Sequence, residues 1–121
     1  GRECVEIQTD SLRVRALPST SAPIYSVVSE GEEFTMKEGE LTLDYVKKIV
    51  KKQKISKDAI KRAGGYEAMQ EQLKDFICIY VDDDYAFVAK DFVKEQYTLK
   101  RATKVSTVKA SSSSGVSIVF L

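Results

Sequence analysis

The residues best suited to chemistry in this chain are two cysteines and one cluster of aspartates. Cys4 and Cys78 lie far apart, and neither is flanked by a second cysteine. The chain contains no histidine, which removes the Ser/His/Asp and Cys/His catalytic arrangements and most zinc sites. A thiol without a neighbouring base is a poor nucleophile. The sequence therefore argues against an enzyme, and we expect no catalytic residue and no cofactor.

The aspartate cluster comprises Asp82, Asp83 and Asp84, with Asp91 nearby. Carboxylates this close can act as an acid and base pair or as calcium ligands. Aspartate is equally suited to tight turns, and the cluster separates two apolar segments. We interpret it as a solvated hairpin turn and expect no metal site.

The two cysteines allow two interpretations. Both lie in segments with strand-like patterns, where a cysteine usually serves as a small buried hydrophobic residue. A disulfide between Cys4 and Cys78 is the alternative, and it would require an oxidising, exported compartment. The sequence leaves the choice open.

Strands with period-two alternation must position these residues. They are expected at residues 4–9, 12–16, 24–28 and 33–37, and the Glu30-Gly31 turn precedes the last of them. Arg13 and Arg15 alternate with apolar neighbours, so both guanidinium groups should point outward. Pro18 and Pro23 bracket a Ser/Thr/Ala segment that predicts a long exposed loop.

The apolar period changes to that of a helix over residues 41–75. Thr42 and Ser56 are suited to cap two helices, Gly64-Gly65 should end the second, and a third short helix follows. Strands return at residues 76–81 and 85–89. The first is almost continuously apolar, which predicts burial on both faces, one of them against the inserted helices.

The order of these segments resembles bacterial SH3-like (SH3b) domains, which occur in exported cell-wall hydrolases with NlpC-type peptidase domains. The first half of the match is Leu12-Arg13-Val14-Arg15, the Pro18-Ser19-Thr20 loop, the strand ending in Val27-Val28, and Glu30-Gly31. The second half is Phe76-Ile77-Cys78-Ile79, the aspartate turn, Ala86-Phe87-Val88 and Lys90-Asp91-Phe92-Val93. Phe76 and Ala86 replace a tryptophan and a glycine of the family, and these departures bear on a ligand site more than on the fold.

The resemblance implies a mainly β fold, an SH3-like small β-barrel interrupted by two or three short helices. Residues 1–97 would form this domain, with the helical insertion at 41–75. The composition of residues 98–121 indicates a Ser/Thr/Lys-rich linker or C-terminal extension. In proteins of this kind such a linker often leads into a peptidase domain. The resemblance also implies a secreted protein of the bacterial cell wall whose partner is peptidoglycan or another wall polymer.

A non-catalytic module of this kind would bind wall peptide and target a linked hydrolase. The candidate ligand-binding residues form an exposed groove beside the Pro/Ser/Thr loop, where this architecture grips extended peptides. They are Arg13, Arg15, Tyr25, Tyr80, Tyr85 and Phe87. The alternative for the aromatic residues is ordinary core packing.

A second feature is a run of cationic residues between positions 47 and 62. Such a run is usually a solvated face, and its functional alternatives are contact with anionic wall polymer or with nucleic acid. A DNA-binding helix pair at residues 42–63 is a weaker hypothesis because base-reading side chains are scarce there. A structural or protein-interaction spacer is another. With a net charge of only +1 and no long apolar run, we expect no nucleic-acid partner and no membrane span.

Overall fold

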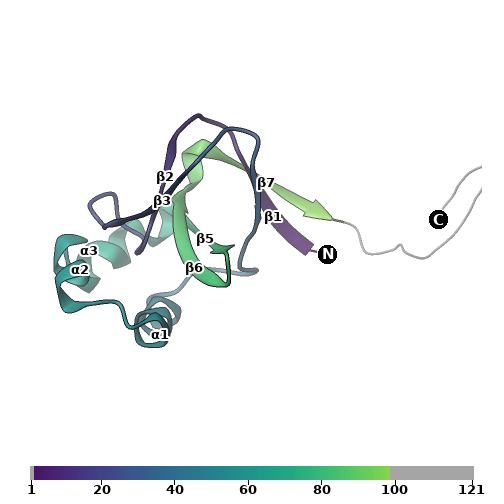
Figure 1. The fold of residues 1–121 in the computed structure, drawn as a ribbon. Coiled ribbons are helices and arrows are strands. Elements are labelled where there is room, and N and C mark those ends of the chain that lie inside the picture. The colour runs from purple at the N-terminus through teal and green to yellow at the C-terminus, as the bar shows by residue number, and fades with distance from the viewer. Residues whose placement is uncertain (1, 99–121) are drawn as a thin grey trace, which may run out of the picture.

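The computed structural model describes residues 2–98 and shows two small sheets with helices inserted between the fourth and fifth strands (Figure 1). The elements are β1 (Arg2–Ile7), β2 (Leu12–Arg15), β3 (Ile24–Val28), β4 (Glu33–Thr35), α1 (Leu43–Gln53), α2 (Lys57–Arg62), α3 (Gly65–Gln72), η1 (Leu73–Asp75), β5 (Phe76–Val81), β6 (Asp84–Ala89), η2 (Lys90–Phe92) and β7 (Val93–Thr98). None of the helices within residues 2–98 is long and apolar enough to span a bilayer.

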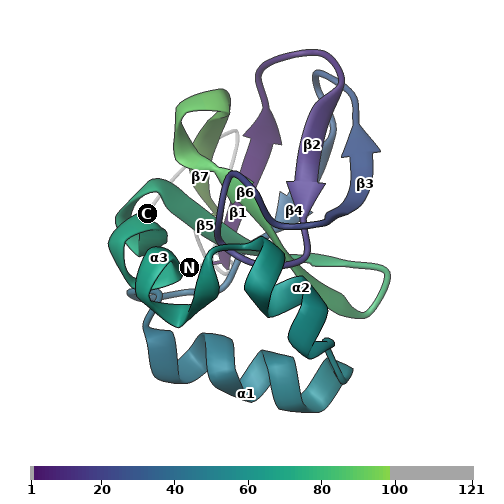
Figure 2. The same ribbon diagram turned by 90° about the vertical axis from the view of Figure 1, so that its left-hand side faces the viewer.

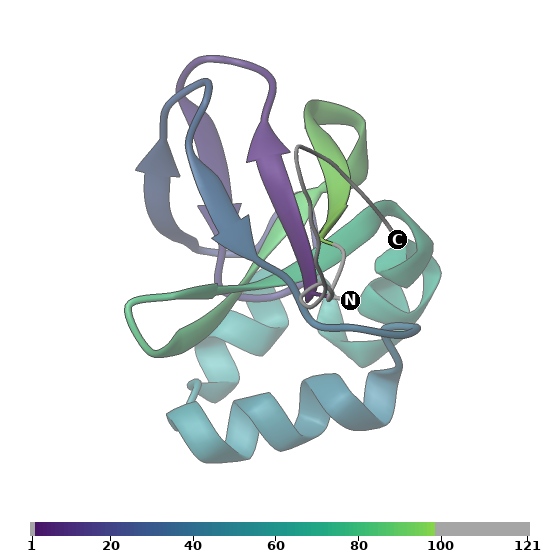
Figure 3. The same cartoon turned by 90° about the vertical axis from the view of Figure 1, so that its right-hand side faces the viewer.

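The strands form one sheet in the order β4-β1-β7 and another in the order β3-β2-β6-β5, and every pairing is antiparallel. Figure 3 shows β1 in purple between β4 in blue and β7 in green. A single bridge between Met36 and Ile79 connects the two sheets. A mainly β fold with inserted helices is therefore confirmed, but over residues 2–98 the two sheets form no closed barrel.

The first hydrophobic core lies between the two sheets. Its buried members are Val5, Ile7, Leu12, Val14, Val28, Met36, Ile77, Ile79, Val81, Ala86 and Val88. The alternation predicted for β1 and β2 is confirmed, because Val5, Ile7 and Val14 are fully buried while Arg13 is exposed. Side chains on one face of a strand recur every second residue, so this pattern fixes which face each sheet turns inward.

The second core lies between the β5–β6 hairpin and the helices, which cover one side of that hairpin in Figure 2. Its buried members are Leu17, Ala22, Val46, Ile49, Ala63, Met69, Leu73, Phe76, Cys78 and Phe87. In β5, Phe76 and Cys78 face this core, whereas Ile77 and Ile79 face the first core. The predicted burial of this strand on both faces is therefore confirmed.

The helix boundaries follow the capping signals in the sequence. Thr42 Oγ1 accepts a hydrogen bond from the Tyr45 amide, and Ser56 Oγ accepts one from the Ala59 amide. These bonds satisfy amides that have no partner inside the helix. Gly64 has φ 93°, and a Cβ atom there would lie 2.7 Å from the Ala68 Cβ, so the turn between α2 and α3 requires glycine.

The loop predicted between Pro18 and Pro23 is present but only partly exposed: Thr20 and Ser21 are exposed, whereas the residues around them are buried or half-buried. Pro18 and Ser19 are fully buried, and Ala22 is 2% exposed. Ser19 Oγ donates a 2.8 Å hydrogen bond to the Ala63 carbonyl, which immediately follows α2. Carbonyls at a helix end lack intrahelical partners, and this loop supplies one. Proline and serine predicted the loop correctly but carried no information about the helices that cover it.

The strand β7 was not predicted, and the strand expected at residues 33–37 is shorter than expected. β7 pairs with β1 over its whole length, from Val93 opposite Ile7 to Thr98 opposite Arg2. Its central residues, Lys94, Glu95 and Gln96, are polar, so no alternation reveals it. The predicted linker falls almost entirely on residues 99–121, outside the described residues.

We predict that Ser19→Ala lowers the free energy of unfolding by roughly 1–3 kcal/mol, because it leaves the buried Ala63 carbonyl without its donor. Urea denaturation measures the change. Ser26→Ala is the matched control, since the Ser26 hydroxyl is buried without a hydrogen-bond partner in the described part of the chain. Removing it should be neutral or stabilising. Equal losses in the two variants would contradict the role given to Ser19.

Candidate functional site

The six predicted site residues do not form one groove. Arg15 lies opposite Phe87 in the β2–β6 pair, and Tyr80 lies opposite Tyr85 in the β5–β6 pair. By strand alternation these four residues and Arg13 share the face of the sheet that the helices cover. Tyr25 packs against the first core, on the other face.

Phe87 is fully buried in the second core, so its predicted place in an exposed groove is wrong. The physical reason is that the inserted helices cover this face of β6. For Phe87 the packing alternative is correct.

Tyr80 and Tyr85 join the sheet to α1. Their rings pack edge to face with centroids 5.0 Å apart, and Tyr85 packs in the same way against Tyr45 of α1. The Gln53 side chain receives a 2.6 Å hydrogen bond from the Tyr85 amide and donates a 3.1 Å bond to its carbonyl. Burial raises the pKa of both Tyr45 and Tyr80. These contacts are structural and leave the rings half-buried.

Two of the predicted residues, Arg13 and Arg15, line a cavity of about 280 Å³. We call it the arginine groove; it is lined by Thr9, Asp10, Ser11, Leu12, Arg13, Arg15, Thr20, Phe76, Ala89 and Phe92. Phe92 is 48% exposed, and the bond from the Gln8 amide to the Phe92 carbonyl, 2.9 Å long, fixes its backbone. The groove thus combines two guanidinium groups, the carboxylate of Asp10, hydroxyls and an accessible aromatic ring.

The helical insertion orients Arg15 through a short series of hydrogen bonds. The Ser19 hydroxyl donates a hydrogen bond to the Ala63 carbonyl. The Ser19 carbonyl in turn accepts a 3.2 Å bond from the Ala22 amide. The Ala22 carbonyl accepts a 2.9 Å bond from Arg15 Nη1. A guanidinium group has five N–H donors, so one bond to Ala22 orients the group and leaves donors for a ligand. Buried residues of the Pro18–Pro23 loop therefore position a side chain of the groove.

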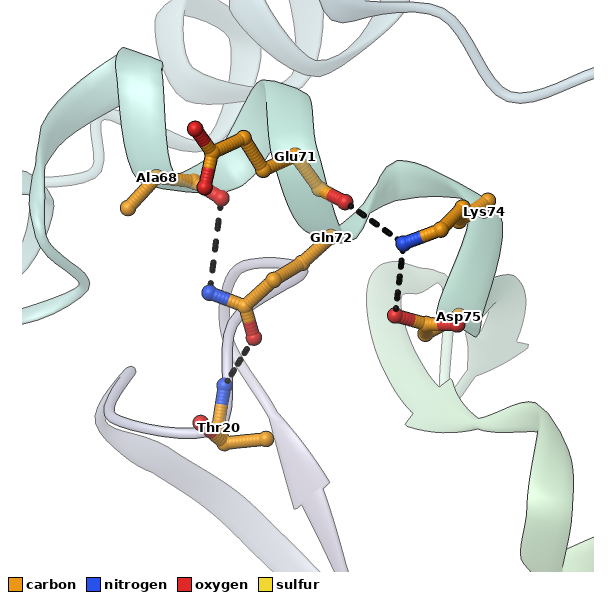
Figure 4. Close-up of polar contacts among 6 residues, drawn as sticks. All are labelled: Thr20, Ala68, Glu71, Gln72, Lys74 and Asp75. Carbon is orange, nitrogen blue, oxygen red and sulfur yellow. Dashed lines mark hydrogen bonds and ion pairs between the residues drawn. The ribbon is translucent and has the colours of Figure 1, made fainter.

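Sequence reasoning missed Phe92, Thr9 and Thr20 as lining residues of the groove. Phe92 belongs to the segment that resembles the closing motif of SH3b domains, and this was the one available signal for it. Thr9 and Thr20 come from separate turns, so only the packing of the loop brings them together. Figure 4 shows Gln72 Oε1 accepting from the Thr20 amide at 3.0 Å, a further contact between α3 and this loop.

A larger cleft of about 850 Å³ lies between η1, β5, β7 and the segment after β4. Its charged lining residues are mixed: Glu3, Glu40, Glu71 and Glu95 with Lys37, Lys74 and Lys90. Lys74 donates to the Glu71 carbonyl and pairs with Asp75 (Figure 4). Cys78 forms part of the wall, but burial raises the pKa of its thiol to about 12. The thiol is therefore protonated at neutral pH and is a weak nucleophile.

Two residues of the aspartate cluster, Asp82 and Asp83, form the turn of the β5–β6 hairpin, as predicted, while Asp84 begins β6 and Asp91 lies in η2. Asp82 and Asp83 have φ values of 49° and 73°, which Asp tolerates better than most residues. Asp84 Oδ2 accepts a 2.7 Å hydrogen bond from the Tyr25 hydroxyl. Within residues 2–98 no group of three or more His, Cys, Asp or Glu side chains could hold a metal ion.

Comparisons with protein-family models, curated proteins and solved structures found no match to this chain. Cys4 and Cys78 are both free thiols; Cys78 is buried and Cys4 is half-buried. This agrees with the interpretation of Cys78 as a small buried hydrophobic residue.

We predict that Tyr25 makes stability pH-dependent in alkaline solution. Its hydrogen bond to Asp84, with a smaller contribution from burial, raises its pKa from 10.0 to about 12. Because the folded state favours the protonated phenol, this stabilisation is complete below pH 10 and is lost as the pH rises through 12. The difference in unfolding free energy between the wild type and Tyr25→Phe should shrink over that range. Urea denaturation at successive pH values measures it, and a constant difference would contradict the assignment.

Proposed function

We propose that this chain is a non-catalytic module that binds cell-wall peptide and targets a larger exported hydrolase to its substrate. The observation that carries the proposal is the arginine groove, where Arg13 and Arg15 lie beside the exposed ring of Phe92. Both arginines belong to the Leu12-Arg13-Val14-Arg15 motif that resembles SH3b domains. The two arginines that line the groove are therefore also the two arginines of the motif.

The groove has the chemistry to hold a carboxylate-bearing peptide. A guanidinium group binds carboxylates through two parallel hydrogen bonds, which gives orientation as well as affinity. Arg15 is oriented by Ala22, while Arg13 is exposed and available to a ligand. The volume of about 280 Å³ lies just below the usual range of roughly 300–1,000 Å³ for small-molecule pockets. It suits one or two residues of a peptide better than a large ligand.

An SH3-like fold is part of the same proposal. Phe76 and Ala86 occupy the positions where the family has tryptophan and glycine. Ala86 is fully buried, so a side chain larger than glycine fits there, and Phe76 is buried while lining the groove. These substitutions therefore preserve packing and change the ligand site at one wall.

Targeting increases the effective concentration of a catalytic domain on its substrate without any chemistry by the module itself. In this proposal the chain that follows β7 links the module to an NlpC-type peptidase domain, and the protein is secreted to the bacterial cell wall. The partner is peptidoglycan, recognised through its peptide. A spacer or protein-interaction domain is the alternative, favoured by the packing roles of Tyr80, Tyr85 and Phe87.

We predict that the chain sediments with purified peptidoglycan and that Arg13→Gln weakens its binding to a soluble wall stem peptide by about tenfold or more. This corresponds to losing a charged hydrogen bond of roughly 1.5–3 kcal/mol. Titration calorimetry measures the affinity. Lys94→Gln is the matched control, because it removes one positive charge from an exposed strand residue outside the groove.

Two results would contradict this function. Sedimentation no greater than that of a charge-matched unrelated protein would favour the spacer alternative. Equal weakening by Arg13→Gln and Lys94→Gln would mean that peptide binding reflects overall charge and not the groove.

A further inference from the structure

The exposed residues of α1, α2 and the turn between them form a strongly basic surface. Figure 2 shows these helices on one side of the sheets. We call this surface the basic helical face; its exposed residues are Lys47, Lys48, Lys51, Lys52, Lys54, Lys57, Lys61 and Arg62. The acidic residues over the same stretch are Asp44 and Asp58. The net charge of +1 for the whole chain therefore conceals a marked local excess of positive charge.

These charges are not neutralised by carboxylates. Within residues 2–98 the structure has one ion pair, Lys74 with Asp75, which lies outside the basic helical face. Lys47 instead lies 5.2 Å from the centre of the Tyr66 ring, and Lys52 lies 5.2 Å from that of Tyr85. A cation–π contact holds an ammonium group in place while leaving its charge available. Ordering the lysines in advance reduces the entropy that binding must overcome.

We propose that the basic helical face binds a linear wall polymer whose charges are phosphodiesters, of the poly(glycerol phosphate) type. A lysine ammonium group is a compact charge that can donate hydrogen bonds to a phosphate approaching from many directions. A face with seven lysines and one arginine therefore suits a flexible chain of repeated phosphates more than a single planar group. The choice of a wall polymer rests on the proposed function, whereas the basic helical face does not.

The surface is poorly suited to a membrane. Helices that lie on a bilayer insert large apolar side chains beside their basic residues. The large apolar residues exposed within the described part of the chain are Ile24, Val27, Phe92 and Tyr97, and none belongs to α1 or α2. The apolar side of α1, including Val46 and Ile49, is already buried in the second core.

The surface is poorly suited to stacking nucleic-acid bases or to reading their sequence. Single strands are bound by stacking bases on accessible aromatic rings, yet lysines cover the rings of Tyr66 and Tyr85. Sequence reading in duplex DNA relies on arginine, asparagine and glutamine. The face has one arginine, and Gln53 is occupied by the backbone of Tyr85.

The test measures binding of the whole chain to poly(glycerol phosphate) of defined length at several salt concentrations. The variant Lys48→Gln/Lys51→Gln/Lys57→Gln changes exposed residues that lie outside both hydrophobic cores. It should bind about tenfold or more weakly, and the slope of log affinity against log salt should fall by about 2. The control Lys74→Gln/Lys90→Gln/Lys94→Gln removes the same charge outside the basic helical face and should bind as the wild type does.

Equal losses in the two triple variants, or no measurable binding by the wild type, would overturn the inference. Tighter binding to duplex DNA or to anionic lipid vesicles than to the polymer would overturn it as well. Arg13→Gln should retain full polymer binding because Arg13 lies in the groove. A wild-type chain that binds the polymer but not the wall peptide would refute the proposed function alone, and one that binds the peptide but not the polymer would refute the inference about the basic helical face alone.

Discussion

Both hydrophobic cores of this protein depend on the β5–β6 hairpin, which is buried on its two faces. Ile77, Ile79 and Val88 pack between the sheets, while Phe76, Cys78 and Phe87 pack against the helices. Truncating a buried side chain such as Phe87 typically costs about 3–5 kcal/mol, a large fraction of the stability of a small domain. The helices are therefore part of the folded unit and supply the cover that one face of this hairpin requires.

The same dependence extends to the arginine groove. Leu17 and Ala22 belong to the second core, so the loop that carries Ser19 is fixed when the helices pack on the sheet. The hydrogen bonds of Ser19 and Ala22 then fix the orientation of the Arg15 side chain. The basic helical face is the outer side of the helices whose inner side forms the core. Packing thus places two polar surfaces of different chemistry on one rigid support.

Local sequence signals predicted most helices and strands. The features that could not be predicted depend on packing between residues distant in sequence. Thr42 and Ser56 predicted where two helices begin, because a helix cap is formed by residues that are neighbours in sequence. The continuous apolar run of β5 indicated two covered faces before the covering elements were known. Burial of Ser19 depends on Ala63, 44 residues away, and β7 is defined by pairing with β1 at the other end of the described chain. Neither relation leaves a periodic pattern.

In the candidate site, strand alternation was enough to predict that Arg13 and Arg15 point away from the first core. It could not show that Phe87 is buried, because the helices that cover Phe87 are distant in sequence. We infer that the helices and the sheets form one cooperative unit built on β5–β6. Native-state hydrogen exchange at increasing denaturant is the decisive test. The core amides of α1 and those of β5 and β6 should open with the same free energy. Exchange of the α1 amides at a distinctly lower free energy, with the sheets still protected, would contradict it.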